Sequence, residues 1–282
     1  MFLINYSNKK YRRAAIFQGV HFILLGGKHF KSFSYEDLPE FFTKRHARAF
    51  NEQRGAGYWI WKPKIIQQAL ELINDDEILL YLDSGINLLK SPEDLIRGLE
   101  SHNIILWNGL GKNKELIRWC HPSVFAKISR AETTKHNPIL MAGAIIIRKN
   151  HRSVELIAKW MELCENEEFL FPDLIEPEVS SDSYIWHRHD SSLLSILAHL
   201  NSEDFLIKDS DHFQTYFDLH RKSKPFFKVL RFRSSFYFKL RLFIVKHMPQ
   251  FLTLFIRKSK FLVISSKRNL TKSEVDSHKK LF

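Results

Sequence analysis

Two segments of the chain carry the residue types that bind charged ligands, and they lie close together in the sequence. Residues 54–63 read Arg-Gly-Ala-Gly-Tyr-Trp-Ile-Trp-Lys-Pro, which brings two cations, three aromatic rings and two glycines into ten residues. Asp83, Ser84 and Gly85 follow the apolar run 78–82. In open α/β sheets, ligands bind just beyond the carboxyl ends of the strands. An acid in that position therefore predicts a ligand contact, and the nearby cations favour a phosphate-bearing ligand such as a nucleotide.

The elements that would position these segments alternate between strands and helices. Short apolar runs bounded by polar residues or glycine predict strands, and apolar residues three or four apart predict helices. The predicted strands are Phe2–Ile4, His21–Leu25, Ile78–Leu82, Asn103–Trp107 and Ile139–Ile147, the last with Gly143 at its centre. The predicted helices cover residues 11–18, 63–73, 154–164 and 193–200. This alternation predicts an α/β domain with a mostly parallel sheet over residues 1–215.

Charge is distributed unevenly along the chain. The net charge is +12, from 43 Lys and Arg against 31 Asp and Glu. Residues 221–282 hold 17 of these cations and only two acids, Glu274 and Asp276. A block of this kind is attracted to a polyanion, which is either a membrane surface or a nucleic acid.

The basic block also has the spacing of an amphipathic helix. Basic, aromatic helices lie in the membrane interface, where anionic lipids attract their cations. The residues expected at the membrane are Lys228, Arg231, Phe236, Lys239, Phe243 and Lys246. We predict that residues 216–264 associate with an anionic membrane and that residues 265–282 form a disordered tail. The alternatives are a helical appendage packed on the body of the protein, and nucleic-acid binding; the slightly acidic body and the lack of a nucleic-acid motif argue against the second.

The cysteines and the apolar runs bear on the compartment. Cys120 and Cys164 are far apart and lack metal-ligand spacing, which is typical of a reduced protein with incidental thiols. No uncharged apolar run approaches the length of about 18 residues that a spanning helix needs. Together with the basic block, these features predict a cytoplasmic protein held peripherally on the inner face of the cell membrane.

Taken in order, the motifs resemble those of bacterial GT-A-type glycosyltransferases that build capsule and lipopolysaccharide. The resemblance rests on residues 54–63, Tyr-Leu-Asp-x-Gly at 81–85, Met-Ala-Gly-Ala-Ile at 141–145 and His-Arg-His-Asp at 187–190, and covers residues 1–205. It implies a GT-A-like domain that transfers a hexose from a nucleotide sugar, UDP-linked by analogy, to a saccharide or lipid-linked acceptor. One position departs from the family pattern, because the second acid expected two residues after Asp83 is Gly85.

The chemistry of sugar transfer assigns roles to the residues of these motifs. Positive charge must stabilise the departing phosphates, and a base must take the proton of the acceptor hydroxyl. The resemblance implies that Asp83 and His189 hold Mn²⁺ or Mg²⁺, that Arg54 and Lys62 neutralise the phosphates, and that Asp190 is the base. The other donor contacts that we expect are Asn5, Tyr6, Ser7, Tyr58, Trp59, Ser84 and Gly85.

Each of these residues also has a purely structural interpretation. Asp190 precedes an apolar helix and could be its N-cap. Asp83 could simply end its strand in a turn, the aromatic side chains could belong to the core, and the cations could be solvated or ion-paired. Because of Gly85, a scaffold with a degenerate and inactive transferase domain is a further alternative.

Overall fold

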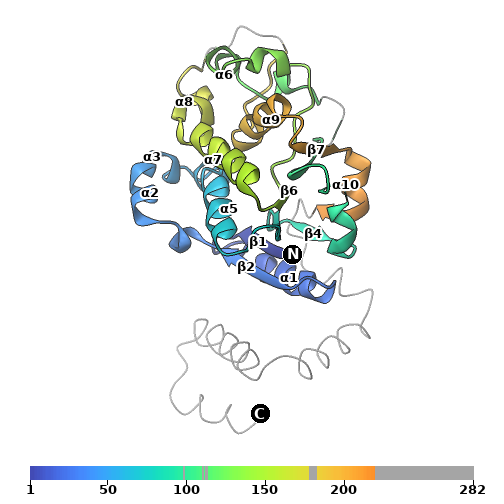
Figure 1. The fold of residues 1–282 in the computed structure, drawn as a ribbon. Coiled ribbons are helices and arrows are strands. Elements are labelled where there is room, and N and C mark those ends of the chain that lie inside the picture. The colour runs from blue at the N-terminus through green and yellow to red at the C-terminus, as the bar shows by residue number, and fades with distance from the viewer. Residues whose placement is uncertain (98, 110, 112–113, 178–182, 220–282) are drawn as a thin grey trace, which may run out of the picture. The chain divides into compact units, whose positions relative to one another are not determined.

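The computed structural model describes residues 1–219 except 98, 110, 112–113 and 178–182 (Figure 1). The chain divides into two units, Met1–Arg221 and Lys222–Phe282. The predicted membrane-associated residues, from Lys228 to Lys246, and the predicted tail lie outside the described residues. Within the part that is described, no helix is long and apolar enough to cross a membrane.

A six-stranded sheet forms the centre of the unit Met1–Arg221. The strand order is β2-β1-β3-β6-β5-β7. Strand β6 runs antiparallel to both of its neighbours, and all other adjacent strands are parallel. The strands are β1 (Phe2–Tyr6), β2 (His29–Phe33), β3 (Ile78–Leu82), β5 (Ile104–Trp107), β6 (Ala144–Arg148) and β7 (Phe205–Lys208). The predicted α/β class with a mostly parallel sheet is confirmed.

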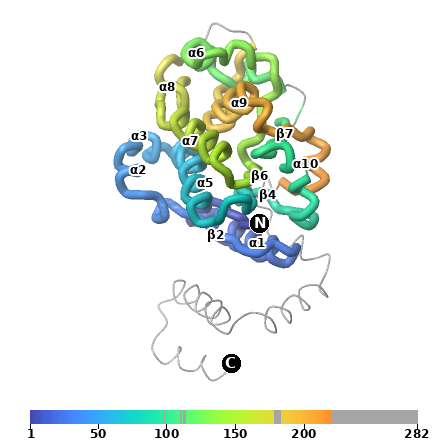
Figure 2. Tube along the Cα trace, in the orientation of Figure 1, coloured from blue at the N-terminus to red at the C-terminus, as the bar shows by residue number. Residues whose placement is uncertain are grey.

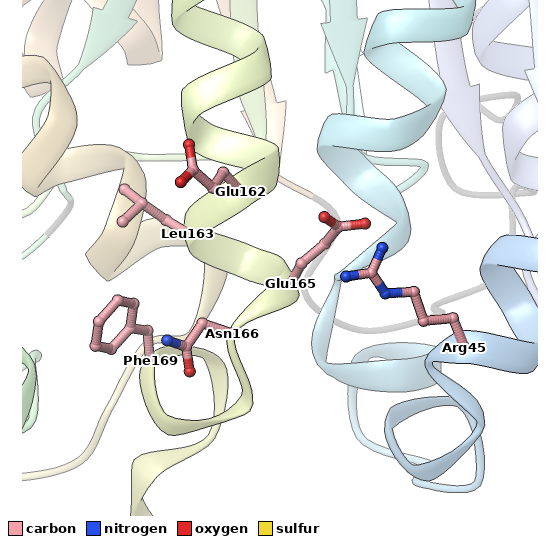
Figure 3. Close-up of a pocket in the computed structure, with 6 residues that line it drawn as sticks. All are labelled: Arg45, Glu162, Leu163, Glu165, Asn166 and Phe169. Atoms are coloured by element: carbon pink, nitrogen blue, oxygen red, sulfur yellow. The ribbon is translucent and has the colours of Figure 1, made fainter.

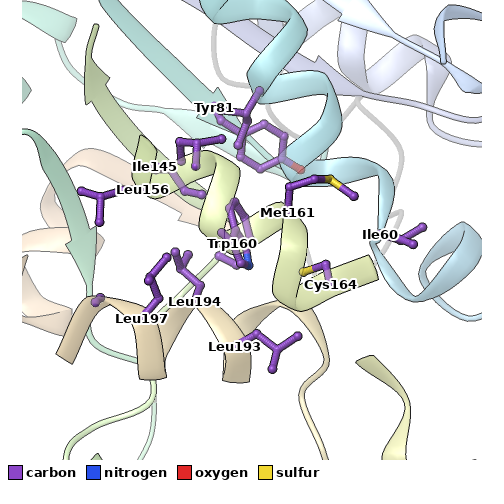
Figure 4. Packing of buried hydrophobic residues seen from close by; sticks show 14 of the residues in the cluster. Ile60, Tyr81, Ile145, Leu156, Trp160, Met161, Cys164, Leu193, Leu194 and Leu197 are labelled. Carbon is purple, nitrogen blue, oxygen red and sulfur yellow. The ribbon is translucent and has the colours of Figure 1, made fainter. Parts of the chain in front are cut away.

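Side chains that alternate along the strands separate the core into two clusters, one on each face of the sheet. On one face, Tyr81 and Ile145 pack with three helices, α5 (Trp61–Glu71), α7 (His151–Glu165) and α9 (Asp190–Leu200). Figure 4 shows this packing, with Trp160 of α7 lying among side chains of the sheet and of α9. On the other face, Leu80 and Trp107 pack with α1 (Arg12–Leu24) and α10 (Ser210–Tyr216).

Shorter elements complete the described unit. The short helices are α2 (Glu40–Arg45), α3 (Ala47–Phe50), α4 (Gly55–Tyr58), α6 (Pro122–Lys127) and α8 (Glu167–Leu170). The 3₁₀ turns are Tyr35–Asp37, Pro92–Ile96, Leu116–Arg118, Ala131–Thr134 and Pro172–Leu174. Strands β4 (Ile86–Leu88) and β8 (Phe217–Leu219) pair with each other in a separate two-stranded sheet. The chain trace in Figure 2 shows α5 and α7 side by side, so residues far apart in the sequence approach one another along this helix pair.

Two of the predicted strands are placed wrongly. Residues 21–25 are not a strand, because α1 continues to Leu24 and buries Phe22 against the sheet. The strand that follows is His29–Phe33, which lies at the edge of the sheet and contains polar residues. Gly143 lies just before β6 rather than at the centre of a strand. The predicted strands 2–4, 78–82 and 103–107 and the four predicted helices are confirmed, within a few residues at their ends and with α1 six residues longer.

The strand order places a switch point at β1, which lies between β2 and β3, the two strands that follow it in the chain. The chain passes from β1 to β2 through α1 on one face of the sheet, and from β2 to β3 through α5 on the other face. The carboxyl ends of the strands at such a switch point are where open α/β sheets bind ligands. The side chain of Ser84, after β3, donates a hydrogen bond to the carbonyl oxygen of Tyr6, at the end of β1.

Candidate active site

The side chains of Lys62, Asp83 and Asp190 meet beyond the carboxyl end of β3, and we call them the Lys62 cluster. Nζ of Lys62 lies 2.7 Å from Oδ2 of Asp190 and 3.4 Å from Oδ1 of Asp83. It also donates a hydrogen bond of 3.1 Å to the carbonyl oxygen of Ala142. Two carboxylate oxygens and one carbonyl oxygen thus surround the ammonium, and of these contacts the one to Ala142 has the geometry of a hydrogen bond.

The two carboxylates of the cluster differ in their exposure to solvent. The side chain of Asp190 is 4% exposed and that of Asp83 is 37% exposed. Asp83 is therefore the member of the cluster that solvent, or a ligand, can reach. Its Oδ1 also accepts a hydrogen bond from the hydroxyl of Tyr81, a fully buried side chain of β3.

Gly143 leaves the space that the carboxylate of Asp83 occupies. A Cβ atom at this position would lie 2.9 Å from Oδ2 of Asp83 and 3.0 Å from the side chain of Ile86. The backbone N–H of Asp83 also donates to the carbonyl oxygen of Gly143, at 2.8 Å. The lack of a side chain at Gly143 therefore allows the carboxylate of Asp83 to approach the backbone closely.

Burial and charge shift the pKa values of the cluster. Burial raises the pKa of Asp190 to about 6; the charge of Lys62 opposes this shift, and the charge of Asp83 adds to it. Burial alone would lower the pKa of Lys62, but the charges of Asp190 and Asp83 outweigh it and raise the pKa. With both carboxylates ionised, the cluster carries one net negative charge, and it binds a proton near pH 6.

Asp190 is placed by the start of α9. It is the first residue of the helix, and the N-cap position belongs to His189, so the alternative that Asp190 caps the helix is wrong. Its carbonyl oxygen accepts a hydrogen bond of 3.1 Å from the indole N–H of Trp160. This contact ties the start of α9 to α7, and it fixes the backbone that carries the carboxylate.

A buried amide pair supports the turn that follows β3. The side-chain N–H of Asn5 donates to Gln18 at 2.7 Å and to the carbonyl oxygen of Ala15 at 3.0 Å. Gln18 in turn donates to the carbonyl oxygens of Asp83, at 2.8 Å, and of Ile86. The network links β1, α1 and the turn 83–86, and its hydrogen bonds fix the backbone position of Asp83.

The predicted donor-binding residues at the end of β1 have internal partners. Asn5 is completely buried, and Tyr6 and Ser7 are 8% and 6% exposed. The ring of Tyr6 stacks on Trp61 with centroids 3.8 Å apart and planes inclined by 15°, and burial raises the pKa of Tyr6 to about 12. The hydroxyls of Ser7 and Ser32 lie 3.3 Å apart. Ser84 and Gly85, after β3, are half-buried.

Residues 55–59 form a left-handed turn that brings two aromatic rings to His189. All five residues have positive φ, with values of 60°, 51°, 101°, 52° and 61°. Three of them, Ala56, Tyr58 and Trp59, carry side chains, which cost about 1 kcal/mol or more each in this conformation. The rings of Tyr58 and Trp59 lie 4.7 Å and 5.9 Å from the imidazole of His189. Strain of this kind persists where the surrounding structure enforces it, typically near functional sites.

The two predicted metal ligands, Asp83 and His189, already have partners in the protein. Asp83 is bound by Lys62 and Tyr81, as described above. Nδ1 of His189 donates to the carbonyl oxygen of Leu170 at 2.7 Å, and its buried Nε2 makes no hydrogen bond to any described residue. Within the described part of the chain, no three His, Cys, Asp or Glu side chains gather in the manner of a metal site. A protein donor set of this composition does not fit Mn²⁺ or Mg²⁺, which prefer several oxygen ligands.

Arg54, the remaining predicted donor contact, lies with a different group of side chains. Its guanidinium is 4.6 Å from the ring centroid of Trp186. None of the ion pairs of Asp83 and Asp190 involves Arg54; among the described residues, these carboxylates pair with Lys62. Figure 3 shows a pocket of about 300 Å³ elsewhere, where the side chains of Arg45 and Glu165 point toward each other. No predicted site residue lines that pocket.

Sequence reasoning missed two residues of the site. Tyr81 stands two positions before Asp83 and therefore points to the same face of the strand, a spacing that could have identified it. Gln18 is in a helix between two predicted strands, and nothing in its local sequence indicates that it reaches the turn after β3.

No family model and no curated protein matches the chain. Solved structures similar to it include the galactosyltransferase LgtC in complex with donor and acceptor sugar analogues, at 15% identity and a TM-score of 0.39, with 74% of each chain covered. A glycosyltransferase involved in the glycosylation of the major capsid of PBCV-1 is similar at 14% identity and a TM-score of 0.36, with 66% of this chain and 80% of that chain covered. The glycosyltransferase GlyE of Streptococcus pneumoniae TIGR4 is similar at 16% identity and a TM-score of 0.34, with 76% of this chain and 46% of that chain covered. Likeness at this level carries no residue role from one chain to the other.

The left-handed turn predicts an unusual response to glycine. Replacing Ala56 by Gly removes a side chain from a position of positive φ, and we expect the free energy of unfolding to rise by about 1 kcal/mol. Ala14, exposed in helix α1, is the matched control. There Ala14→Gly is expected to lower the free energy of unfolding by about 0.5–1 kcal/mol. Chemical denaturation of both variants measures the two changes in the free energy of unfolding. Destabilisation by Ala56→Gly would contradict the left-handed conformation of residue 56.

The buried imidazole of His189 predicts a loss of stability in acid. Burial lowers the pKa of His189 to about 4 from its ordinary value of 6.5. The unfolded chain therefore takes up the proton first, so the contribution of this residue to stability is present above pH 6.5 and is lost as the pH falls toward 4.

The variant His189→Asn isolates this effect, because asparagine tolerates positive φ and does not titrate. We expect the unfolding free energy of the wild type to fall by about 2 kcal/mol more than that of the variant between pH 7 and pH 4.5. The comparison is needed because Asp190 titrates in the opposite sense over an overlapping range. Parallel pH profiles of the two proteins would show that His189 is not a buried neutral imidazole.

Proposed function

We propose that this protein is a glycosyltransferase that moves a hexose from a nucleotide sugar, UDP-linked, to a saccharide or lipid-linked acceptor in surface polysaccharide synthesis. The observation that carries the proposal is the Lys62 cluster, which presents one exposed carboxylate, Asp83, at the switch point between β1 and β3. The crevice at a switch point is where α/β sheets bind nucleotides. The motifs that resemble GT-A enzymes contribute all three members of the cluster.

In this proposal the donor binds at the carboxyl ends of β1 and β3. Tyr6, Ser7, Ser84 and Gly85 contact the nucleotide. Asp83 is the carboxylate that contacts the donor, and Tyr81 and Lys62 orient it through Oδ1. A carboxylate that is held from two sides loses little freedom when the ligand binds, which favours a well-defined position of the sugar.

Asp190 is our candidate for the base that takes the proton of the acceptor hydroxyl. Its pKa of about 6 leaves it ionised at neutral pH and still basic enough to accept a proton, a match that suits general base catalysis. Lys62 acts as a positioning residue, because its charge keeps the buried carboxylate ionised. The one net negative charge of the cluster is the charge that the incoming proton neutralises.

Hydrolysis of nucleotide sugars by the purified full-length protein tests the proposal. The panel contains UDP- and GDP-sugars, each with Mn²⁺, Mg²⁺ or EDTA, so that the expected metal is examined by direct comparison. We expect slow cleavage of one donor. Asp190→Asn should lower the rate by about 10²- to 10⁴-fold, and Asp83→Asn should weaken donor binding and turnover together. Asp75→Asn, an exposed carboxylate at the other end of β3, is the control and should behave as wild type.

The pH profile gives an independent readout. The rate is expected to fall about tenfold per pH unit below pH 6, because the base is then protonated. Lys62→Met removes the charge that keeps Asp190 ionised, so the fall in rate should begin at a higher pH. Lys62→Arg keeps the charge and should bring the pH profile part of the way back to that of the wild type. A protein that binds no donor and cleaves none would contradict the proposal, and one that binds a donor without turnover in both wild type and Asp83→Asn would be a non-catalytic scaffold.

We keep as part of the proposal that the basic segment 216–264 holds the enzyme on an anionic membrane, where a lipid-linked acceptor would lie. Cosedimentation with vesicles of phosphatidylglycerol or phosphatidylcholine measures this. Replacing Lys228, Arg231 and Lys239 together by Glu should abolish binding to the anionic vesicles. The matched control replaces Lys9, Lys10 and Lys44 by Glu, with the same change in net charge. Equal loss in both triple variants would argue against a specific segment.

A further inference from the structure

Four side chains beside the candidate active site form an exposed surface of arginine and tryptophan, which we call the Trp186 patch. The guanidinium of Arg54 lies 4.6 Å from the ring centroid of Trp186, and that of Arg188 lies 5.3 Å from the same ring. Arg188 also lies 4.7 Å from the ring of Trp119, and the two indoles are 6.4 Å apart. Two guanidiniums thus converge on one indole that is 42% exposed.

The exposure of Trp186 does not come from a loose backbone. The N–H groups of Ile185 and Arg188 donate hydrogen bonds of 2.9 Å to the carbonyl oxygens of Arg118 and Trp119. The hydroxyl of Tyr184 is bonded to Asp173 on the same side. Ile185 is also 50% exposed. An indole and an aliphatic side chain that are held rigidly in solvent mark a surface that a partner covers.

The patch carries two guanidinium groups. Arg54 makes no ion pair with a carboxylate of the described residues, and its guanidinium lies over the indole of Trp186. Burial is the main cause of the lowered pKa of His189; the charges of Arg54 and Arg188 lower this pKa further, while the hydrogen bond to Leu170 and the charge of Asp173 oppose the shift. The field of the two guanidiniums therefore reaches the residue that directly precedes Asp190. A ligand that carries negative charge is attracted to the guanidinium of Arg54.

The residues of the Trp186 patch are close in the sequence to residues of the candidate active site. Trp186 and Arg188 precede the buried carboxylate of Asp190 by four and two residues, in a segment whose backbone is fixed at both ends. Arg54 begins the left-handed turn whose aromatic rings contact His189. The patch is therefore joined to the start of α9, the helix that carries the candidate base.

We propose that the Trp186 patch is the acceptor subsite and that it takes an anionic saccharide. Arg54 and Arg188 hold the carboxylate or phosphate group of the sugar, because guanidinium matches both in geometry and in charge. The exposed part of the indole packs against the apolar C–H groups of the sugar ring. The assignment rests on the proposed function, and it moves Arg54 from the predicted donor contact to the acceptor.

Fluorine NMR of the full-length protein labelled with 5-fluorotryptophan tests the subsite locally. The variant Trp186→Phe identifies the resonance of Trp186. The probes are trigalacturonate, which carries carboxylates, glucose 6-phosphate, which carries a phosphate, and maltotriose, which is neutral. We expect the Trp186 resonance to move with one or both acids, and the two acids distinguish the kind of anion. Arg54→Gln and Arg188→Gln should each weaken binding by about tenfold or more.

Controls separate this site from general attraction to the basic C-terminal segment. That segment is present in the wild type and in every variant, and it holds none of the tryptophans. Arg97→Gln, an arginine of the same unit that is 84% exposed, should leave the titration of Trp186 unchanged. An unmoved Trp186 resonance at millimolar concentrations of both acids overturns the proposal, as does an equal shift with maltotriose. Donor hydrolysis by the unmodified protein decides the transferase proposal separately, so either can fail without the other.

Discussion

The buried ammonium of Lys62 is the interaction on which the candidate site depends. Moving an ammonium out of water costs several kcal/mol, which an isolated lysine could not sustain in this position. Here Asp190, Asp83 and the carbonyl oxygen of Ala142 surround it. These partners come from the start of α9, the end of β3 and the segment before β6. One cation therefore fixes the relative positions of three segments that are distant in the sequence.

The same arrangement explains why the two carboxylates behave differently. Asp190 is enclosed by the core formed between α7 and α9, so burial raises its pKa and the ammonium keeps it ionised. Asp83 lies just beyond the end of β3, where solvent reaches it. Its position depends on the absence of a side chain at Gly143 and on the hydroxyl of Tyr81. A single buried charge thus pairs with one carboxylate in the core and with one that is open to solvent.

Further polar and strained features gather around this cluster. The buried side-chain amides of Asn5 and Gln18 bond to each other, and Gln18 also bonds to the turn after β3. The left-handed turn 55–59 keeps three residues with side chains at positive φ. The rest of the unit is simpler, with two apolar clusters on a sheet whose side chains alternate regularly. Such local departures from low-energy structure in an otherwise regular fold are typical of a functional site.

The sequence by itself determined the fold class, most of the elements and the identity of the central site residues. Apolar runs and helical stripes are local signals, so β3, β5, α5, α7 and α9 could be predicted, and the motifs that resemble GT-A enzymes pointed to Lys62, Asp83 and Asp190. The edge strand β2 was missed because its residues are largely polar and the apolar run before it belongs to α1. Only the tertiary structure decided that Lys62 pairs with both acids, that Arg54 lies on Trp186, and that residues 55–59 wind left-handed. Ion pairing, burial and strain depend on residues that are brought together by folding, and no local pattern encodes those distances.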